Sequence, residues 1–407
     1  MKILLVSLNY APEQTGIGKF QGEMAAWLTA HGHQVRAIAA PPYYPEWKIG
    51  EGYSACRYKI EEIEGIRIYR VPLYVPSVPS GTLRLIHLLS FAGTSLPVIL
   101  WQALTWRPDV VEITAPPLMA APTVLLAGKA MGIPTHLHVQ DFEVDAAFNL
   151  GLLKRDWLFR AALKVERILL RSFSTVSSIS PRMRDRLLAK GVHRDRVFLL
   201  PNWAGVGDFD PVQESGKWRD RLGANSETVL AVYSGNLGRK QGLEVIVEAA
   251  RRLQDVSRIR FIISGDGAGR DDLVAKAEEL KNIIFLPVQP LQDFIHLMLA
   301  ADIHLLPQKA EAADLVMPSK LGNILASGRP IVAGAEPNTQ IFDAIQGCGL
   351  AVKPDDVDAF VGAILRLAND KELRIQMGIV GRRRAQEEWS KDGILSKFET
   401  LLENERH

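Results

Sequence analysis

The sequence predicts an α/β protein with two doubly wound, Rossmann-like domains that face a cleft. Short apolar runs alternate with segments of helical spacing. This alternation occurs twice, and the polar stretch 202–225 separates the two occurrences. Strand–helix alternation implies parallel sheets covered by helices on both faces. We expect an N-terminal domain in 1–202, a second domain in 203–385, and a C-terminal helix in 386–407 that packs back toward the first domain.

The first domain takes its strands from continuous or alternating apolar runs. We expect strands at 2–8, 33–40, 65–72, 109–114, 134–141, 174–180 and 196–202. Segments with apolar residues at helical spacing lie between most of these runs, and several end in glycine, which is a helix stop signal. We expect helices at 20–32, 119–132, 156–173 and 181–191.

The second domain repeats the pattern. We expect strands at 228–235, 258–267, 282–288, 302–307 and 330–334, and helices at 243–254 and 291–301. Leu321, Ile324 and Leu325 predict a further short helix, because their spacing is helical. Pro318 with Ser319 is a start signal for it, and Gly328 is a stop signal. The tail from Asp370 is charged and helical.

Composition excludes several classes of protein. The 407 residues are 47% hydrophobic and 23% charged, with a net charge of +2, which fits a globular protein and gives no case for nucleic acid binding. Cys56 and Cys348 have no metal-type spacing, so a reducing compartment is expected. The apolar run near the N-terminus is too short for a signal peptide and predicts the first strand instead. We expect a cytoplasmic protein.

The segment 85–106 is apolar enough to raise the question of contact with a membrane. Its 22 residues carry no charge apart from His87, and about 20 apolar residues can span a bilayer. However, it also contains Gly93, Pro97 and several polar residues, and a strand pattern follows it directly. We expect a buried helix pair or a helix that lies in the membrane interface, rather than a full span.

Candidate binding residues follow the predicted strands, because doubly wound sheets bind ligands at the carboxyl ends of their strands. After the first strand, Gly16 and Gly18 precede a helix, and a glycine-rich turn lets backbone approach a phosphate or a sugar. A plain tight turn is the alternative. Gly22 comes four positions after Gly18 instead of three, and no acidic residue clearly ends the second strand, so an NAD enzyme is disfavoured.

A polar cluster is expected at the end of strand 134–141. His136, His138 and Gln140 share one strand face. Three carboxylates follow in the next loop: Asp141, Glu143 and Asp145. The histidines could be metal ligands, but donors this close on one strand rarely complete a site. We expect hydrogen-bonding groups that line the cleft, with ordinary polarity at the end of a strand as the alternative.

The loops of the second domain collect features that suit phosphate. Cations follow strand 228–235, at Arg239 and Lys240, and a solvated pair of loop charges is the alternative. Strand 258–267 ends in a second glycine-rich turn that contains Gly265. Ser319 and Lys320 stand at the start of the short helix, where free N–H groups, a hydroxyl and an ammonium favour an anion. We therefore expect a nucleotide diphosphate in the second domain and its reacting partner in the first.

Together these motifs resemble the retaining glycosyltransferases of the two-Rossmann-domain type, the GT-B fold, family 4. The similar stretches run from end to end and include TGIGKFQGEMAAWL, HVQDFEVDA, SGNLGRKQGLE and PSKLGNILASGRPIVA. Within the family, the first two and APPYYPEW are most similar to the colanic acid exopolysaccharide glycosyltransferases, usually taken to be fucosyltransferases.

The resemblance implies roles for particular residues, with departures from the family pattern. Ser319 and Lys320 match the position that binds the donor diphosphate. The family often has two glutamates in this region. Asn323 stands at the position of the second and can still hydrogen-bond to ribose. The first falls next to Asp314, and either Asp314 or Glu311 is its expected replacement.

The basic pair of the family is also shifted, and the cleft histidine is replaced. Asn236 stands where an arginine is common, so Arg239 and Lys240 are the expected substitutes. The cleft histidine corresponds to Gln140, with His138 beside it. The predicted catalytic residues are His138, Asp141, Asp314 and Glu311, and the predicted donor-binding residues are Gly16, Gly18, Asn236, Arg239, Lys240, Gly265, Ser319, Lys320 and Asn323.

The reaction implied is transfer of a sugar, with retention, from a nucleotide-diphosphate donor to a lipid-linked (polyprenyl-diphosphate) oligosaccharide in exopolysaccharide synthesis. GDP-fucose is favoured as donor, and a UDP-sugar is possible. Positioned cations and N–H groups can stabilise the leaving diphosphate, so no metal or other cofactor is expected. The resemblance implies attack on the front face of the sugar. A nucleotide-sugar epimerase of the same architecture is the alternative, and a two-lobed binding protein is a non-enzymatic one.

A cationic strip on the predicted helix 156–173 suggests contact with a membrane. Basic residues recur on one helical face, at Arg160, Lys164, Arg167 and Arg171. Such a strip can face anionic lipid head groups, and the uncharged 85–106 lies in the same domain. A solvated face of a packed helix is the alternative. We expect a peripheral protein at the inner face of the plasma membrane.

Overall fold

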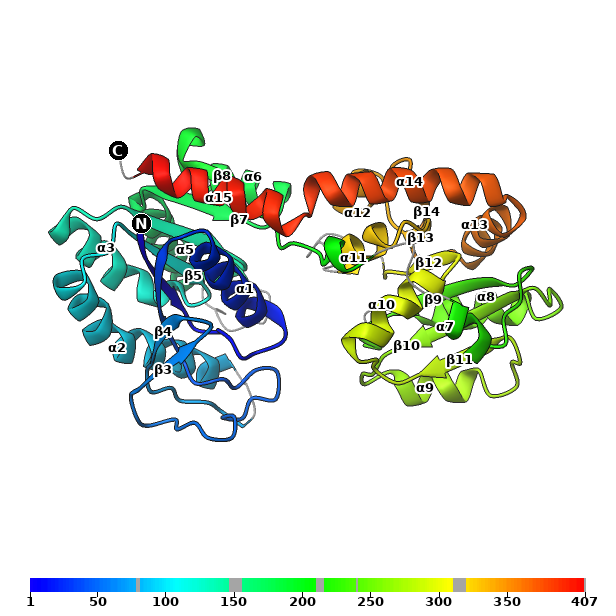
Figure 1. The fold of residues 1–407 in the computed structure, drawn as a ribbon, viewed down its shortest axis with the longest axis horizontal. Coiled ribbons are helices and arrows are strands. Elements are labelled where there is room, and N and C mark those ends of the chain that lie inside the picture. The colour runs from blue at the N-terminus through cyan, green and yellow to red at the C-terminus, as the bar shows by residue number, and fades with distance from the viewer. Residues whose placement is uncertain (78–80, 146–155, 210–215, 239–240, 310–319, 406–407) are drawn as a thin grey trace. The chain divides into compact units, whose positions relative to one another are not determined.

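The computed structural model describes residues 1–77, 81–145, 156–209, 216–238, 241–309 and 320–405, and it divides the chain into two compact units (Figure 1). The first unit comprises Met1–Asn202 together with Ile394–His407, and the second comprises Trp203–Gly393. The chain therefore returns to the first unit at Ile394, within the expected C-terminal segment 386–407, and the first unit is built from two separate stretches of sequence.

Within the described residues, the first unit contains an eight-stranded sheet in the order β3-β4-β2-β1-β5-β6-β7-β8. All neighbouring pairs are parallel except β3 and β4. The strands are β1 (Lys2–Ser7), β2 (Gln34–Ala39), β3 (Lys59–Ile63), β4 (Ile66–Arg70), β5 (Val110–Ala115), β6 (Thr135–Val139), β7 (Thr175–Ser178) and β8 (Val197–Leu199). The expected parallel sheet is confirmed, and β3 is an addition. It forms a hairpin with β4 through Glu64 and Gly65, both at positive φ, as a two-residue hairpin turn favours.

Helices cover both faces of this sheet. They are α1 (Gly16–Ala30), α2 (Gly81–Thr105), α3 (Ala121–Met131), α5 (Asp156–Ser172), α6 (Pro181–Ala189) and α15 (Lys391–Glu405), with short 3₁₀ turns η1 (Leu118–Ala120) and η2 (Arg194–Arg196). Residues of α2, α3 and α5 pack with Val111, Ile113 and Leu137 in one apolar core. Alternate residues of the same strands, including Glu112 and His136, point to the opposite face, where Gln21 of α1 and Phe398 of α15 meet them.

The segment 85–106 lies in a single helix, so the expected helix pair is wrong. Helix α2 runs from Gly81 to Thr105 with Pro97 inside it. It is long and apolar enough to cross a membrane by length and composition, with a mean hydropathy of 1.6 over its best window, yet only 33% of that window is buried. Pro97 is exposed, where the missing N–H leaves no buried polar group unpaired. The helix buries one face and leaves the rest of its surface uncovered.

The end of the chain belongs to the first unit through α15. Ile394, Leu395, Phe398 and Leu402 are its buried residues, at the spacing of one helical face. The Phe398 ring centroid lies 5.2 Å from that of His136. His33 Nε2 lies 2.7 Å from Glu399 Oε1, which fixes the exposed side of the helix.

The second unit, within the described residues, contains a six-stranded parallel sheet in the order β11-β10-β9-β12-β13-β14. The strands are β9 (Val229–Ser234), β10 (Ile259–Ser264), β11 (Ile283–Leu286), β12 (Ile303–Leu306), β13 (Ile331–Gly334) and β14 (Gly349–Val352). The five expected strands are confirmed, and β14 was not predicted. The helices are α7 (Gly216–Arg221), α8 (Glu244–Arg252), α9 (Arg270–Lys276), α10 (Leu291–Ala300), α11 (Lys320–Ala326), α12 (Gln340–Ala344), α13 (Val357–Asn369) and α14 (Lys371–Glu388), with the 3₁₀ turn η3 (Val206–Asp208).

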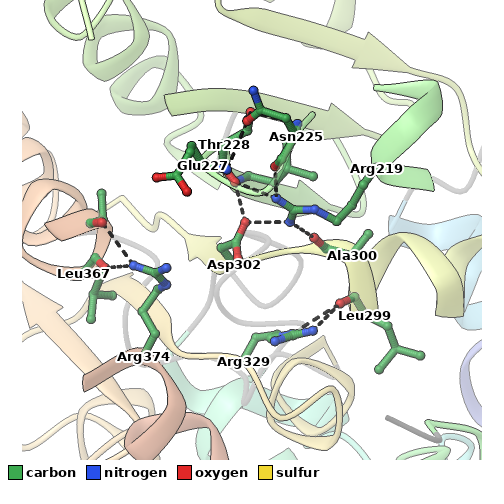
Figure 2. A network of polar contacts seen from close by, with 12 residues as sticks. Arg219, Asn225, Glu227, Thr228, Leu299, Ala300, Asp302, Arg329, Leu367 and Arg374 are labelled. Atoms are coloured by element: carbon green, nitrogen blue, oxygen red, sulfur yellow. Dashed lines mark hydrogen bonds and ion pairs between the residues drawn. The ribbon is translucent and has the colours of Figure 1, made fainter. Parts of the chain in front are cut away.

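A polar network fixes the two central strands of this sheet at their amino ends. Figure 2 shows the Arg219 guanidinium, which donates to Asp302 Oδ2 at 2.8 Å and to the Thr228 carbonyl at 2.6 Å. The same carboxylate accepts the backbone N–H of Leu230 in β9 at 2.9 Å. Because Asp302 immediately precedes β12, these bonds tie β12 to β9. They lie at the end opposite to the strands' carboxyl termini, so their role is structural.

Candidate functional site

The sheet order places a switch point in each unit. In the first sheet the connections reverse direction between β1 and β5, and in the second between β9 and β12. Ligands of doubly wound sheets bind outside the carboxyl ends of the strands at such points. Each unit therefore has its own candidate site, at the loops after β1, β5 and β6 in the first unit and after β9, β10 and β12 in the second.

In the loop after β1, Glu13 binds the loop after β2, and the neighbouring Gly18 leaves room for its side chain. Glu13 is buried, and its Oε1 accepts the backbone N–H groups of Tyr43 and Tyr44 at 3.0 Å each. A Cβ on Gly18 would lie 2.5 Å from Glu13 Oε2, so this glycine makes room for the carboxylate. Gly16 begins α1 with φ +60, a conformation that favours glycine. The close packing accounts for Gly18 by itself, and a role of either glycine in binding a donor stays a prediction.

Behind the end of β6, His138 is part of a chain of hydrogen bonds. The Gln140 side chain exchanges two hydrogen bonds of 2.9 Å with the Asn202 side chain. Its Nε2 also lies 2.9 Å from His138 Nε2. His138 Nδ1 is 2.8 Å from Ser177 Oγ, which in turn is 2.8 Å from His136 Nε2. Both ring nitrogens of His138 therefore have partners.

The chain fixes the tautomers of both histidines. An amide nitrogen can only donate, so His138 Nε2 accepts from Gln140 and His138 Nδ1 carries the hydrogen that goes to Ser177. Ser177 then donates its single hydrogen to His136 Nε2, and His136 Nδ1 donates to Thr175 at 2.7 Å. Burial lowers the pKa of both rings to about 3, so both stay neutral at physiological pH. His138, predicted as catalytic, is thus placed as a neutral support for Gln140.

The carboxylates after β6 differ from one another. Asp141 is exposed. Glu143 accepts the backbone N–H of Leu118, and burial raises the pKa of Glu143 to about 7, with the charge of Asp141 adding to the effect. A carboxyl group that titrates near neutral pH is suited to general acid–base chemistry. Glu143 is therefore a candidate alongside Asp141. Glu143 lies in the motif identified from the sequence, but the burial that distinguishes it from Asp141 comes from the tertiary structure.

A second buried carboxyl group lies in the centre of the first sheet. Glu112 on β5 accepts from Thr114 at 2.8 Å, and Thr114 accepts from Gln21 of α1 at 2.6 Å. Burial raises the pKa of Glu112 to about 8, so it is largely protonated at pH 7. Glu112 could not be singled out from the sequence, since one glutamate in an apolar run has no distinguishing pattern.

Three glycines shape the carboxyl edge of the second sheet. Gly235, Gly265 and Gly267 have φ of +143, +145 and +154. A Cβ on Gly265 would lie 1.9 Å from the Gly235 carbonyl oxygen, so the turns after β9 and β10 touch through their backbones. Asn236 is exposed beside them, and its Oδ1 would lie 2.5 Å from a Cβ on Gly267. Close backbone approach of this kind suits phosphate binding.

Lys320 extends from the start of α11 to this edge. Its Nζ donates to the Tyr233 hydroxyl at 2.7 Å and lies 4.5 Å from the centre of the Tyr233 ring. A Cβ on Gly235 would lie 2.2 Å from Lys320 Cε, so the glycine leaves room for the lysine chain. Burial lowers the pKa of Lys320 to about 8. Among the described residues no carboxylate forms an ion pair with this ammonium.

Asn323, one helical turn after Lys320, lies partly exposed on the same helix. The short helix predicted from Leu321, Ile324 and Leu325 is confirmed as α11. Five other predicted residues lie outside the described residues, and their roles stay predictions: Arg239, Lys240, Glu311, Asp314 and Ser319.

Among the described residues, His33 and two residues of α15, Glu399 and Glu403, place possible metal-ligand atoms within 4.8 Å of one another, and His138 is not in this group. At the second sheet, an ammonium beside tight glycine turns, with no carboxylate partner among the described residues, can bind a phosphate group. The arrangement at the first sheet offers neutral hydrogen-bonding groups and carboxyl groups to a second reactant.

Comparison with known proteins identifies the family. A family model described as glycosyl transferase 4-like domain matches residues 15–203, and one described as glycosyl transferases group 1 matches residues 214–384. A protein of Escherichia coli K12, assigned as the colanic acid biosynthesis glycosyl transferase WcaI, is 41% identical over 98% of this chain and 98% of its own. Bacillus subtilis TuaC, assigned to teichuronic acid biosynthesis, is 26% identical over 91% of this chain and 90% of its own.

Solved structures agree on the fold. Sucrose-phosphate synthase from Thermosynechococcus elongatus superposes with a TM-score of 0.73 at 17% identity, covering 99% of this chain and 98% of that one. Anabaena HepE in complex with UDP gives 0.71 at 14% identity, covering 99% and 100%. The sequence matches and the two Rossmann-like units lead to one conclusion: the chain is a glycosyltransferase and belongs to the group 1 and 4-like family with the GT-B fold.

Proposed function

We propose that this glycosyltransferase transfers a sugar, with retention, from a nucleoside-diphosphate donor to a lipid-linked oligosaccharide during exopolysaccharide synthesis. One observation carries the donor half of the proposal. Lys320 is a partly buried cation whose ammonium has no carboxylate partner among the described residues. Burying an uncompensated charge is costly, so such a group favours an anionic ligand. The diphosphate of the donor supplies that anion.

The identity of the donor rests on relatives. The resemblance to the colanic acid exopolysaccharide glycosyltransferases, usually taken to be fucosyltransferases, makes GDP-fucose the first donor to test. The HepE structures contain UDP and UDP-glucose, which keeps a UDP-sugar as the second candidate. An epimerase is not favoured, because the family models and the relatives named above are transferases.

We further propose that the reaction needs no metal. The leaving diphosphate would be stabilised by the Lys320 ammonium and by backbone N–H groups of the glycine turns, which do not require a bridging cation. The reaction should then proceed in excess EDTA.

The decisive experiment incubates the full-length protein with labelled GDP-fucose or UDP-glucose and a polyprenyl-diphosphate oligosaccharide, with and without EDTA. Label in the lipid fraction with an unchanged anomeric configuration supports the proposal. Release of an epimerised nucleotide-sugar contradicts it. Loss of activity in EDTA that Mn²⁺ or Mg²⁺ restores contradicts only the metal-independent part.

Peripheral membrane contact is part of the proposal, because the acceptor is lipid-linked. Along α2, large apolar side chains are exposed on one side over its whole length, among them Leu85, Leu89, Leu96 and Leu104. Surface helices of soluble proteins normally present polar side chains there. We propose that this stripe enters the head-group region of a bilayer.

The cations of α5 would add attraction to anionic lipid. Arg160, Lys164 and Arg167 are exposed. Arg171 differs, since its guanidinium donates to the Lys190 carbonyl at 3.1 and 3.2 Å. All four cations of the expected strip therefore lie at the surface, and Arg171 also fixes the end of α6.

Vesicle flotation separates the two contributions. Changing Leu85, Leu89 and Leu96 to Ser should abolish recovery with anionic vesicles, whereas changing the first three cations of the strip to Gln should weaken it mainly at low salt, because salt screens such charges. The matched control replaces Ile375 and Ile379, exposed aliphatic residues of α14, with Ser. Equal recovery of all variants would contradict membrane contact through α2.

A further inference from the structure

Tyr233 is a buried residue near the end of β9 that has no assigned role. It is 1% exposed, and its ring belongs to the core of the second unit. Its hydroxyl, however, reaches the carboxyl edge of the sheet, where it meets Lys320 and the turn after β9. A phenylalanine would fill the same space, so packing alone does not explain the hydroxyl.

The hydroxyl has a defined donor and acceptor arrangement. It has one hydrogen, which it donates to the Asn236 carbonyl at 2.7 Å. Its oxygen therefore accepts from Lys320 Nζ, also at 2.7 Å. Burial raises the pKa of Tyr233 above its usual value, so the hydroxyl keeps this hydrogen. One oxygen atom thus joins the lysine of α11 to the backbone of the turn after β9.

The surrounding glycines hold this arrangement in place. The Lys320 chain passes through the space that a side chain on Gly235 would fill. The Gly235 carbonyl in turn contacts Gly265 at the position where a Cβ would stand. A lysine on the surface samples many rotamers and loses that freedom when it binds an anion. Here the Tyr233 hydroxyl and ring and the Gly235 backbone confine the lysine chain.

We propose that the Tyr233 hydroxyl is a positioning group for the donor diphosphate, which holds the Lys320 ammonium in its binding position and keeps the Asn236 turn in the conformation that receives the phosphates. The inference rests on the proposed role of Lys320 in donor binding. Tyr233 acts through Lys320 and the backbone of the turn, and it takes no part in bond making or breaking.

Tyr233→Phe in the full-length protein tests the hydroxyl alone, because the ring that faces the ammonium is kept. Affinity for GDP and for UDP is measured by calorimetry, and KM and kcat with the accepted donor. We expect affinity for the accepted nucleotide to fall about 3–10-fold, which corresponds to one net hydrogen bond. The loss should appear in KM more than in kcat, because positioning acts on binding.

A double-mutant cycle with Lys320→Ala tests the coupling. In the Lys320→Ala background, Tyr233→Phe should change affinity by less than about twofold, since the group that the hydroxyl positions is gone. Independent effects that multiply would overturn the inference. If Lys320→Ala itself leaves nucleotide affinity unchanged, the proposed role of Lys320 fails. If Lys320→Ala weakens binding and Tyr233→Phe does not, only the present inference fails.

The pH profile distinguishes positioning from a merely structural role. Nucleotide affinity should decline on the alkaline side as Lys320 loses its proton. Removing an oxygen that accepts from the ammonium disfavours the charged form, so Tyr233→Phe should move this decline to lower pH by about 0.4–1 unit. A uniform loss of affinity without movement of the decline contradicts the inference. Tyr58→Phe, which removes an exposed hydroxyl bonded to the Thr94 carbonyl, is the control and should change neither quantity.

Discussion

The polar groups at the carboxyl edges of the two sheets differ in their hydrogen-bond partners. At the first sheet, a chain of hydrogen bonds runs from Ser177 through His138 to Gln140. It ends at the Asn202 side chain. At the second, the Lys320 ammonium has a hydroxyl as neighbour and, among the described residues, no carboxylate. At the first edge the histidine chain is paired internally, whereas at the second, among the described residues, an ammonium has no anion beside it. A polar group that the protein has satisfied is a poor guide to ligand binding, and one that it has left uncompensated is a good guide.

The largest effect is expected where the charge is uncompensated. Lys320→Ala should lower kcat/KM for the donor by about 10–200-fold, since a charge-assisted hydrogen bond contributes about 1.5–3 kcal/mol. Steady-state kinetics with varied donor measures it, and circular dichroism checks that the variant is folded. Unchanged kinetics would mean that the diphosphate binds elsewhere and that the contrast between the two edges is mistaken.

Substitutions at the first edge should lower the free energy of unfolding. Ser177→Ala leaves the Nδ1 hydrogen of His138 buried without an acceptor and should cost about 1–3 kcal/mol of unfolding free energy. Urea denaturation measures this. Ser178→Ala is the matched control, because that equally buried serine only donates to the Val139 carbonyl, so its loss should cost less. Equal losses would show that the histidine chain contributes nothing specific.

Glu112 should make the stability of the first unit depend on pH. The pKa of this carboxyl group is raised to about 8 by burial, so the folded protein holds a proton that the unfolded chain releases above its ordinary value of 4.5. Wild-type stability contributed by this group is therefore present below pH 4.5 and lost as pH rises toward 8, at about 1.4 kcal/mol per pH unit or less. Glu112→Gln should remove this loss. Urea denaturation of both proteins at pH 5 and 7 would show a larger gain for the variant at pH 7, and a gain independent of pH would refute the assignment.

The smallest effect concerns the donor near neutral pH. The pKa of Lys320 is lowered to about 8 in the free protein, so the charged form that binds an anion is present below that value and lost above it. Nucleotide affinity should be nearly constant from pH 6 to 7, fall about twofold by pH 8, and then decline up to tenfold per unit. Calorimetry in buffers of different ionisation enthalpy should also show proton uptake on binding at pH 8. Binding without proton uptake at that pH would exclude Lys320 as the titrating group.

The fold was predictable because most strands between the sheet edges are apolar runs, continuous as in β1 and β9 or alternating as in β2, as buried strands require. The failures have physical causes. Strand β3 contains Lys59, Glu61 and Glu62, and as an exposed edge strand it has no apolar run. For the segment 85–106 a buried helix pair was one of two expectations, but an exposed proline is tolerated within a single helix when tertiary packing holds the flanking turns.

The candidate site was predictable only in part. Lys320 could be located, because a lysine at a helix start after a strand is a local signal. Tyr233 was missed, since a tyrosine in an apolar strand indicates core packing, and only the fold brings its hydroxyl to Lys320. The neutrality of His138 and the raised pKa of Glu143 depend on burial, which spacing along one strand does not reveal. Arg171 similarly fits a cationic strip in sequence but binds the Lys190 carbonyl in the fold.

The return of the chain to the first unit has a consequence for biosynthesis. The second unit is contiguous, and its two ends are adjacent, since the Ala204 N–H donates to the Trp389 carbonyl at 3.0 Å. All of its residues have been synthesised once residue 393 is added, whereas the first unit, although begun earlier, lacks α15 until residues 391–405 have been made. Nascent chains would thus carry an incomplete first unit, with His136 and its neighbours uncovered, for as long as the second unit takes to be made. A chain that ends after residue 393 would contain the whole second unit and a first unit without Ile394–His407, so we expect it to be bound by chaperones or degraded rather than to act as an enzyme.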